Sequence, residues 1–419
     1  MTIASDAAQH LQCAARAARA ASQTLAHTST AQRNDALHAM AAALRGQAPA
    51  IIEANAADLA NSAGTEAFRD RLALSEARIA AMAEGLATVA ALPDPLSRVL
   101  EEWSRPNGLR IQRLATPIGV IGMIYESRPN VGADAAGLCL KSGNAVILRG
   151  GSESTMSARA IHAALASGLR KAGLPEAAVQ IAPTADRAYV AAMLSAAGLL
   201  DLIIPRGGNA LVERVLHEAR VPVLAHAEGL CHTYVHRAAD HAMARRIVAN
   251  AKMRRTGICG ATETLLIDRA IAADLLGAMV ADLAALGCTF RADAAARDIV
   301  PWLPPAMATD FDTEWLDAIL SIAVVDGVDA ALAHISRHGS GHTGAIITED
   351  AAAAEQFLRG LDSAVGLWNA STQFCDGGEF GFGAEIGIAT GRIHARGPVG
   401  LEQLTTYRYV VRGTGQVRP

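Results

Sequence analysis

The chain has 419 residues, of which 51% are hydrophobic, 4% aromatic and 19% charged. At about 150 residues per domain, this length predicts two to three domains with a sizeable core, and the apolar content excludes a disordered chain. With 37 basic and 41 acidic residues the net charge is −4, which argues against nucleic acid as the main partner. The sequence holds no run of about 18 apolar residues, so we expect no membrane span.

Residues 1 to about 92 predict helices, because Ala, Leu and Ile recur at helical spacing. Prolines end that pattern, and Asn107-Gly108 follows between two strand-like runs. Asn-Gly favours a two-residue hairpin turn, so we expect a hairpin here. The tail, Thr406–Arg412, predicts a further strand that could pair with this hairpin. Because an open sheet edge invites unwanted pairing, we expect hairpin and tail to pair across subunits.

From Pro117 onward the pattern changes to short apolar runs separated by helical stretches. Strands alternating with helices predict a parallel, doubly wound sheet, in which ligands bind at the carboxyl ends of the strands. After about residue 256 the alternation restarts, which predicts a second such unit. The expected strands are Val120–Tyr125, Ala145–Leu148, Val179–Ala182, Asp201–Ile204, Val221–Leu224, Thr262–Ile267, Ile319–Val325, Gly344–Thr348 and Ala364–Trp368.

The six cysteines, none in a C-x-x-C pair, fit a reducing cytosol. Cys259 stands out because it lies between glycines directly before a predicted strand. Three cations precede it within a few residues: Lys252, Arg254 and Arg255. Nearby positive charge lowers the pKa of a thiol and favours the nucleophilic thiolate. A buried structural cysteine is the alternative that these local features leave open.

The other cysteines fit structural roles better. Cys231 precedes His232, but neighbours in a strand point to opposite faces, so the two cannot easily form a thiolate–imidazolium pair. Cys375 lies in an acidic, glycine-rich loop that we expect to be flexible, and it is a weaker alternative nucleophile. Three more cysteines have apolar surroundings and are expected in the core: Cys13, Cys139 and Cys288.

The segment Glu126–Asn130 follows directly after a predicted strand, where a parallel sheet presents catalytic groups. The amide of Asn130 could donate to a developing oxyanion, and the forked donors of Arg128 suit a phosphate or carboxylate. The plainer interpretation makes Asn130 the N-cap of a helix over residues 131–141.

Two glycine turns follow other predicted strands. Arg149–Ser152 combines a cation, two glycines and a hydroxyl before a helix, which suits an adenosine ribose and its phosphate. Arg206–Gly208 has the same order, with an ordinary strand-to-helix turn as the alternative. The sequence carries no G-x-G-x-x-G fingerprint, no P-loop and no metal-ligand spacing, so a Rossmann-type dehydrogenase is not favoured and we expect no metal.

Taken together, the sequence resembles the gamma-glutamyl phosphate reductases of the aldehyde dehydrogenase superfamily. The resemblance implies an aldehyde dehydrogenase-like α/β fold with two doubly wound parallel-sheet domains and a small β oligomerisation extension. It places the dinucleotide-binding domain at 1–103 and 116–255, the catalytic domain at 256–391, and the extension at 104–115 and 392–419. The matching stretches are Tyr125–Val131, Lys141–Gly151, Asp201–Gly208, the Cys259 segment through Leu266, and His394–Arg412.

The resemblance also implies an activity. This is the NADPH-dependent reduction of L-glutamyl 5-phosphate to L-glutamate 5-semialdehyde and phosphate, through a cysteine thioacyl intermediate, in cytoplasmic proline biosynthesis. It further implies a homo-oligomer, either dimer or tetramer, and leaves room for channelling from a glutamate 5-kinase.

By the same resemblance, Cys259 is the nucleophile, Asn130 is the oxyanion donor, and Glu314 holds the nicotinamide ribose. Arg128 and Lys252 are the candidates for binding the substrate's phosphate or carboxylates. Glu228 lies near the place where hydrolytic relatives activate water, and it is not assigned that role. The expected cofactor-binding residues of the two glycine turns are Arg149, Gly150, Gly151, Ser152, Arg206, Gly207 and Gly208.

Two rival functions remain. One is an aldehyde oxidiser of the same superfamily that hydrolyses its thioester. The other is an inactive binding or scaffolding protein that kept the fold, although the joint presence of Cys259, Asn130 and Glu314 argues against it. An assay of NADP reduction with and without inorganic phosphate would separate the oxidiser from the reductase.

Overall fold

The computed structural model describes residues 3–62, 65–126, 128–225 and 228–418. It divides into two compact units. Residues 226–255 were expected in the first domain, but strand β7 (Cys231–Val235) and helix α10 (His241–Met253) belong to unit 2, because β7 pairs with two strands of that unit. Unit 1 is Met1–Ala225, Gly381–Gly387 and Val399–Pro419, and unit 2 is His226–Phe380 and Ile388–Pro398.

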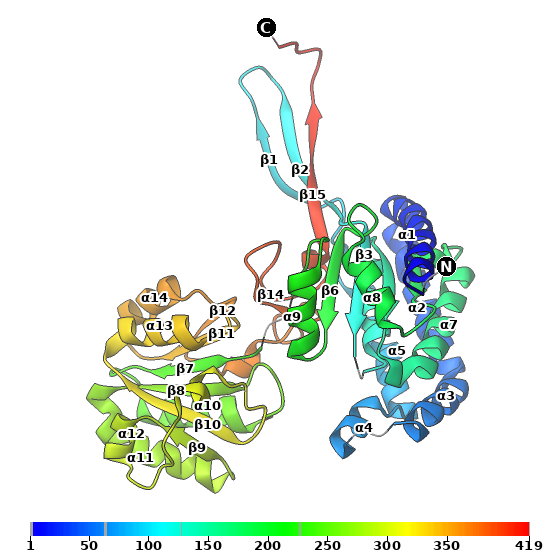
Figure 1. The fold of residues 1–419 in the computed structure, drawn as a ribbon. Coiled ribbons are helices and arrows are strands. Elements are labelled where there is room, and N and C mark those ends of the chain that lie inside the picture. Colours follow the sequence, from blue (N-terminus) through cyan, green and yellow to red (C-terminus); the bar gives the residue numbers. More distant parts are fainter. Residues whose placement is uncertain (1–2, 63–64, 127, 226–227, 419) are drawn as a thin grey trace. The chain divides into compact units, whose positions relative to one another are not determined.

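A four-stranded parallel sheet forms the centre of unit 1, with strand order β5-β4-β3-β6 (Figure 1). Every residue of β3 and β4 is buried, as expected for strands covered on both faces. Val221–Leu224 was expected as a strand but makes only one bridge, between Val223 and Ile203, because Pro222 has no N–H for a ladder. The strands are β3 (Val120–Tyr125), β4 (Ala145–Arg149), β5 (Val179–Ile181) and β6 (Leu202–Arg206).

Alanine-rich helices pack around this sheet. In α1, residues Ala7, Leu11, Ala15 and Ala18 form a buried stripe against the sheet core. Cys13 falls off that stripe and is exposed, so its expected core position is wrong. The helices are α1 (Ile3–His27), α2 (Thr30–Gly46), α3 (Ala48–Ala60), α4 (Glu66–Leu72), α5 (Glu76–Ala91), α6 (Val131–Lys141), α7 (Thr155–Lys171), α8 (Arg187–Leu194) and α9 (Asn209–Glu218), with short 3-10 turns η1 (Ser152–Ser154), η2 (Glu176–Ala178) and η5 (Glu402–Leu404).

Unit 1 also carries a three-stranded antiparallel sheet, ordered β1 (Val99–Ser104), β2 (Arg110–Pro117) and β15 (Thr405–Arg412) (Figure 1). The hairpin is confirmed, but its turn differs. Only Gly108 has a positive φ, 87°, and its N–H bonds to Arg105 O, which makes a three-residue loop with proline in the first turn position. The tail pairs with β2 of its own chain. Pairing across subunits therefore stays a prediction for the outer edges of this sheet.

Unit 2 is built on a six-stranded parallel sheet, ordered β12-β11-β7-β8-β10-β9. Leu265 and Ile267 join the core on one face of the sheet, and Leu266 joins the core on the other. The short strand β9 was not predicted, because Arg291 interrupts its apolar pattern. The strands are β7 to β12: Cys231–Val235, Thr262–Asp268, Thr289–Ala292, Ile319–Val325, Thr343–Ile347 and Val365–Trp368.

The remaining elements of unit 2 cover the sheet and close its ends. Helices α10 and α11 belong to the larger core and α13 and α14 to the smaller one. The elements after α10 are α11 (Arg269–Ala285), α12 (Ala294–Ile299), η3 (Ala308–Asp312), α13 (Gly327–His338), α14 (Ala351–Gly360), η4 (Thr372–Phe374), β13 (Ile388–Ala389) and β14 (Gly397–Pro398).

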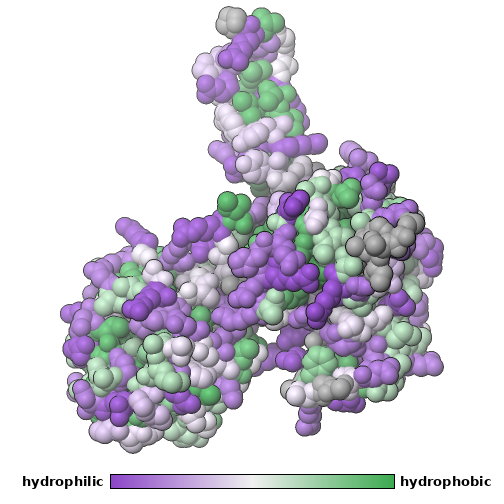
Figure 2. All heavy atoms as spheres, viewed as in Figure 1, coloured by the Kyte–Doolittle hydropathy of each residue, from purple (hydrophilic) through white to green (hydrophobic). Residues whose placement is uncertain are grey.

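The viewed surface is largely hydrophilic, with small apolar patches (Figure 2). Exposed apolar side chains lie on β15, where Tyr407, Tyr409 and Val411 are about half exposed. Among the described residues, no helix combines the length and apolarity that crossing a bilayer would require.

Candidate active site

Cys259 lies in a turn between α10 and β8, where the Ala261 N–H donates to Ile258 O at 3.0 Å. The thiol side chain is only partly buried. It packs against a small apolar cluster of Val365, Cys375 and Ile388. The alternative of a fully buried core cysteine therefore does not hold for Cys259.

Gly229 connects Cys259 with Glu314. A Cβ atom at Gly229 would lie 2.2 Å from Cys259 O and 2.5 Å from its Cα, so only glycine allows this approach. The N–H of Gly229 donates to Glu314 Oε1 at 2.9 Å. Burial raises the pKa of Glu314, while the Gly229 N–H lowers it and the charge of Glu228 raises it further. The structure thus brings Cys259 and Glu314 to the same backbone contact.

Lys252 was expected to bind substrate anions, but its ammonium is fully buried. Its Nζ lies 2.5 Å from Glu263 Oε2, and the two side chains are 0% and 1% exposed. Burial raises the pKa of Glu263 to about 7, and Lys252 acts against that rise. A lysine committed to an internal carboxylate cannot also reach substrate, so the structure corrects the role of Lys252.

The Cys259 loop is also held from the 371–375 segment. Gln373 accepts from Arg254 Nη1 at 3.1 Å and donates to Ala251 O at 2.9 Å. Cys375 was expected in a flexible loop but is 4% exposed, because this segment packs under the nucleophile. Cys231 donates to Cys259 O at 3.0 Å, and burial raises the pKa of its thiol, which fits its expected structural role.

In unit 1, Asn130 stands at the N-cap position of α6 but makes no capping hydrogen bond. Its Nδ2 donates instead to Asp134 Oδ2 at 3.1 Å. Burial raises the pKa of Asp134 to about 6, although the Asn130 bond and the charge of Arg206 both lower it. The amide is therefore oriented by a carboxylate: Asn130 is the N-cap residue of α6 by position, as the plainer interpretation has it, but its side chain does not cap the helix.

Arg149, at the end of β4, is 9% exposed, and its Nη2 donates to Ala185 O at 2.5 Å. Its Nε is buried and meets no hydrogen-bond partner among the described residues. Burial lowers the pKa of Arg149; the charges of Glu153 and Glu126 raise it, and those of Arg187 and Arg214 lower it. These two cations were not singled out from the sequence, because α8 and α9 bring them to Arg149 only in the fold.

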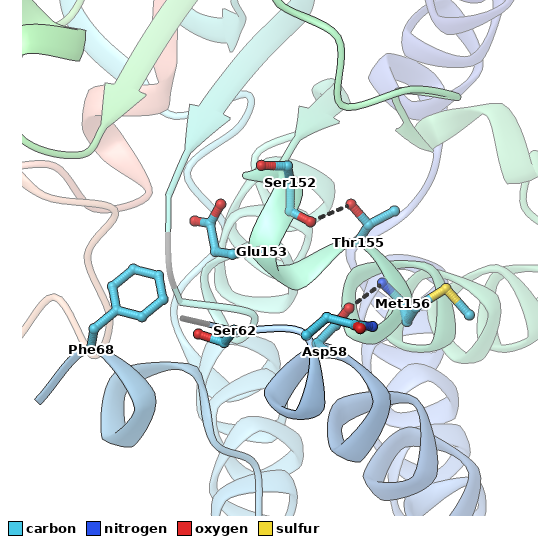
Figure 3. A pocket seen from close by; sticks show the side chains of 8 residues that line it. Asp58, Ser62, Phe68, Ser152, Glu153, Thr155 and Met156 are labelled. Atoms are coloured by element: carbon cyan, nitrogen blue, oxygen red, sulfur yellow. Dashed lines mark hydrogen bonds between the residues drawn. The ribbon is translucent and has the colours of Figure 1, made fainter. Parts of the chain in front are cut away.

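Beside this turn lies a pocket of about 510 Å³ (Figure 3). Ser152 and Glu153 of η1 line it together with residues of α3 and α4. Asp58 accepts from the Met156 N–H at 3.1 Å and so caps the start of α7 at the pocket wall (Figure 3). The glycines have a steric reason, since a Cβ at Gly150 would lie 3.1 Å from the Tyr125 ring.

The second glycine turn precedes α9. The N–H of Gly208 donates to Glu126 Oε2 at 3.0 Å, and a Cβ on Gly208 would meet nothing within 4 Å. The Glu126 carboxylate thus already accepts from a backbone N–H at a helix N-terminus, which is the chemistry of an anion site. Arg206 is half-buried beside Gly387, and Arg128 is exposed.

The expected site residues therefore fall into two groups. Cys259, Glu314 and Lys252 belong to unit 2, and the others belong to unit 1. Within the described ranges, no group of three or more His, Cys, Asp or Glu side chains could hold a metal ion.

Comparisons with known proteins agree with this arrangement. The sequence model of the aldehyde dehydrogenase family matches residues 1–301. Gamma-glutamyl phosphate reductase of Gluconobacter oxydans is 69% identical over 99% of this chain and 97% of its own. The same-named protein of Acidiphilium cryptum is 68% identical over 98% and 97%. The crystal structure of the Thermotoga maritima gamma-glutamyl phosphate reductase superposes with a TM-score of 0.96 at 43% identity, covering 98% of this chain and 100% of that one. The chain therefore belongs to the aldehyde dehydrogenase family.

Proposed function

We propose that this protein reduces L-glutamyl 5-phosphate to L-glutamate 5-semialdehyde and phosphate with NADPH, as a cytoplasmic step of proline biosynthesis. The names of its relatives give the substrate. The single observation that carries the chemistry is a partly exposed Cys259 on a loop that shares the Gly229 contact with Glu314.

The thiolate of Cys259 attacks the acyl carbon of the substrate, and the carbon–oxygen bond to phosphate breaks, which leaves a thioester. The Asn130 amide and the Cys259 backbone N–H stabilise the oxyanion formed on the way, and loss of one such donor typically costs about 3 kcal/mol. NADPH, when bound, supplies the hydride that reduces the thioester carbonyl. Collapse of the resulting thiohemiacetal breaks the carbon–sulfur bond, releases the semialdehyde and returns the Cys259 thiolate.

The residues of both glycine turns fit a dinucleotide. Arg149 offers a buried Nε that meets no hydrogen-bond partner among the described residues, and the Gly208 N–H already donates to a carboxylate oxygen of Glu126. We assign Arg149, with Gly150, Gly151 and Ser152, to the adenosine ribose and its 2′-phosphate. Arg206, Gly207 and Gly208 serve the pyrophosphate, and Glu314 serves the nicotinamide ribose. Arg128 is exposed and remains the candidate for the substrate's anionic groups.

The two units divide the work in this proposal. Unit 1 binds the adenosine and pyrophosphate parts of the dinucleotide, unit 2 carries the nucleophile and Glu314, and the β1-β2-β15 sheet joins subunits into a dimer or tetramer. The apolar side chains exposed on β15 support such a contact. Channelling from a glutamate 5-kinase would act through the assembled form.

The test runs the reaction backward. The purified protein should reduce NADP with glutamate 5-semialdehyde only when inorganic phosphate is present, because phosphate must attack the thioester. Steady turnover without phosphate would identify the rival aldehyde oxidiser, which uses water instead. No turnover under either condition would favour the inactive scaffold.

A further inference from the structure

A buried ion pair closes the base of the Cys259 loop. Lys252 stands in the last turn of α10, and Glu263 is the second residue of β8, so the pair brackets the loop. The ammonium and carboxylate meet at 2.5 Å with almost no exposure. The two ends of the loop are therefore fixed to each other by this side-chain pair.

The second oxygen of the same carboxylate reaches a different segment. Glu263 Oε1 accepts from the Leu316 N–H at 3.3 Å. Leu316 adopts φ 50°, a conformation that costs a non-glycine residue free energy and persists only when its surroundings enforce it. Glu314 lies two residues earlier and holds the Gly229 N–H, next to Cys259. One carboxylate thus ties the Cys259 loop and the Glu314 segment together.

We propose that Lys252 and Glu263 are positioning residues that set the spacing between Cys259 and Glu314. This inference rests on the proposed role of Glu314 toward the cofactor. The charge of Lys252 favours the ionised form of the buried Glu263 carboxylate. That carboxylate in turn accepts from the Leu316 N–H and so holds the backbone at Leu316 in place. Spacing matters because reacting atoms must approach within about 3–3.5 Å, and a misplacement of about 1 Å can cost 100-fold in rate.

The competing explanation is that the pair only stabilises the fold. Buried ion pairs can often be replaced by two apolar residues without loss of stability, whereas removal of one partner leaves a costly buried charge. A purely structural pair therefore predicts that a double apolar replacement restores every property. A positioning pair predicts that the replacement restores stability alone.

The experiment compares wild type with Lys252→Met, Glu263→Leu and the double variant Lys252→Met/Glu263→Leu. Three properties are measured: the thermal unfolding midpoint, the Kd for NADPH by fluorescence titration, and the rate of Cys259 alkylation by iodoacetamide, followed by mass spectrometry without cofactor. We expect the single variants to lower the midpoint and the double variant to recover it. Because Leu316 then lacks its acceptor, the double variant should bind NADPH about tenfold more weakly and change the alkylation rate about threefold or more.

A second double variant tests rescue. Lys252→Met/Glu263→Gln keeps a carbonyl acceptor for the Leu316 N–H, so its NADPH Kd should return to within about threefold of wild type. The matched control is Arg245→Met, also on α10, which breaks an exposed ion pair with Asp282 of α11 and should leave all three properties unchanged.

The outcomes separate the two proposals. Wild-type NADPH affinity and alkylation rate in the Met/Leu double variant would overturn the positioning role. If Glu314→Gln binds NADPH as tightly as wild type, the proposed role of Glu314 itself fails, and this inference falls with it. A weakened Glu314→Gln together with an unaffected Met/Leu variant overturns the positioning role alone.

Discussion

The two groups of site residues are held in opposite ways. In unit 2, the Cys259 loop is fixed by the buried Lys252–Glu263 pair and by Gln373. In unit 1, Ser152 is exposed, and the space around Gly208 is open. Covalent chemistry needs a reacting atom held in place, whereas a dinucleotide needs free donors that it can satisfy itself. The firmly held loop thus belongs to unit 2, and the exposed turns belong to unit 1.

The largest expected effect on activity comes from replacing the nucleophile of unit 2. Cys259→Ala should reduce phosphate-dependent NADP reduction by more than about 10⁴-fold, because no other group can form the thioester. The binding of NADPH, measured by fluorescence, should stay near wild type, because the unit 1 turns are intact. Cys13→Ala, at an exposed position of α1, is the control and should keep full activity. Substantial turnover by Cys259→Ala would refute the mechanism.

The next effect is smaller and lies in unit 1. Asn130→Ala should lower kcat by about 10²- to 10³-fold, because it removes an oxyanion donor. The KM for NADPH should change little. Asn107→Ala, in the exposed hairpin turn, serves as the control. If the two alanine variants prove equally active, Asn130 is not the donor, and its bond to Asp134 is only structural.

A third substitution tests cofactor binding in unit 1 separately from the covalent chemistry in unit 2. Arg149→Met should raise the KM for NADPH by about tenfold or more and leave the KM for NADH unchanged, because only NADPH carries the 2′-phosphate. Arg170→Met removes an exposed cation at the other end of α7 and should affect neither cofactor. Equal losses with both cofactors would mean that Arg149 does not contact the 2′-phosphate.

The smallest expected effect is on how the free energy of unfolding depends on pH. Burial lowers the pKa of His232, in unit 2, to about 3. The unfolded chain then binds a proton below about pH 6.5 that the folded chain refuses, so stability is complete above that pH and is lost as the pH falls. The contribution of His232 to the free energy of unfolding should fall by about 1.4 kcal/mol per pH unit between about pH 6 and 4. Asp134, in unit 1, has a raised pKa and acts with the opposite sign.

Denaturant unfolding at pH 4.5 to 7 checks this prediction. Tryptophan fluorescence reports mainly on unit 2, which holds Trp302, Trp315 and Trp368. His232→Asn should unfold with a shallower pH slope than wild type, and the difference between the two isolates the histidine from other titrating groups. Parallel slopes would show that His232 is not the acid-sensitive group.

Much of the fold follows from local pattern. The strands β3, β4, β8 and β10 were predicted within one residue, because each is an apolar run bounded by polar or turn residues. The unit boundary was misplaced by 30 residues, because the sequence of β7, whose residues are all buried, does not indicate which of the two sheets it joins. Only its pairing with β8 and β11, a long-range contact, assigns it to unit 2.

The site could be predicted from the sequence where the type of residue and its neighbours in the chain indicate the chemistry. A cysteine between glycines and cations pointed to the nucleophile, but Lys252 was misread, because a sequence does not reveal burial. Glu263 and Gly229 were missed for a related reason. Glu263 becomes important through its contact with Leu316, and Gly229 through its approach to Cys259, and neither contact is local in sequence.

The β1-β2-β15 sheet has a consequence for biosynthesis. Arg412 on β15 hydrogen-bonds Gln112 on β2, and the two residues are 300 positions apart. At translation speeds of about 5–20 residues per second, β2 waits about 15–60 s on the ribosome for its partner. During that interval the edge of β2 that does not pair with β1 has no strand partner, and unit 2 has time to fold first. The nascent chain is then most vulnerable to aggregation at this edge, and a chaperone that shields extended strands would protect it there.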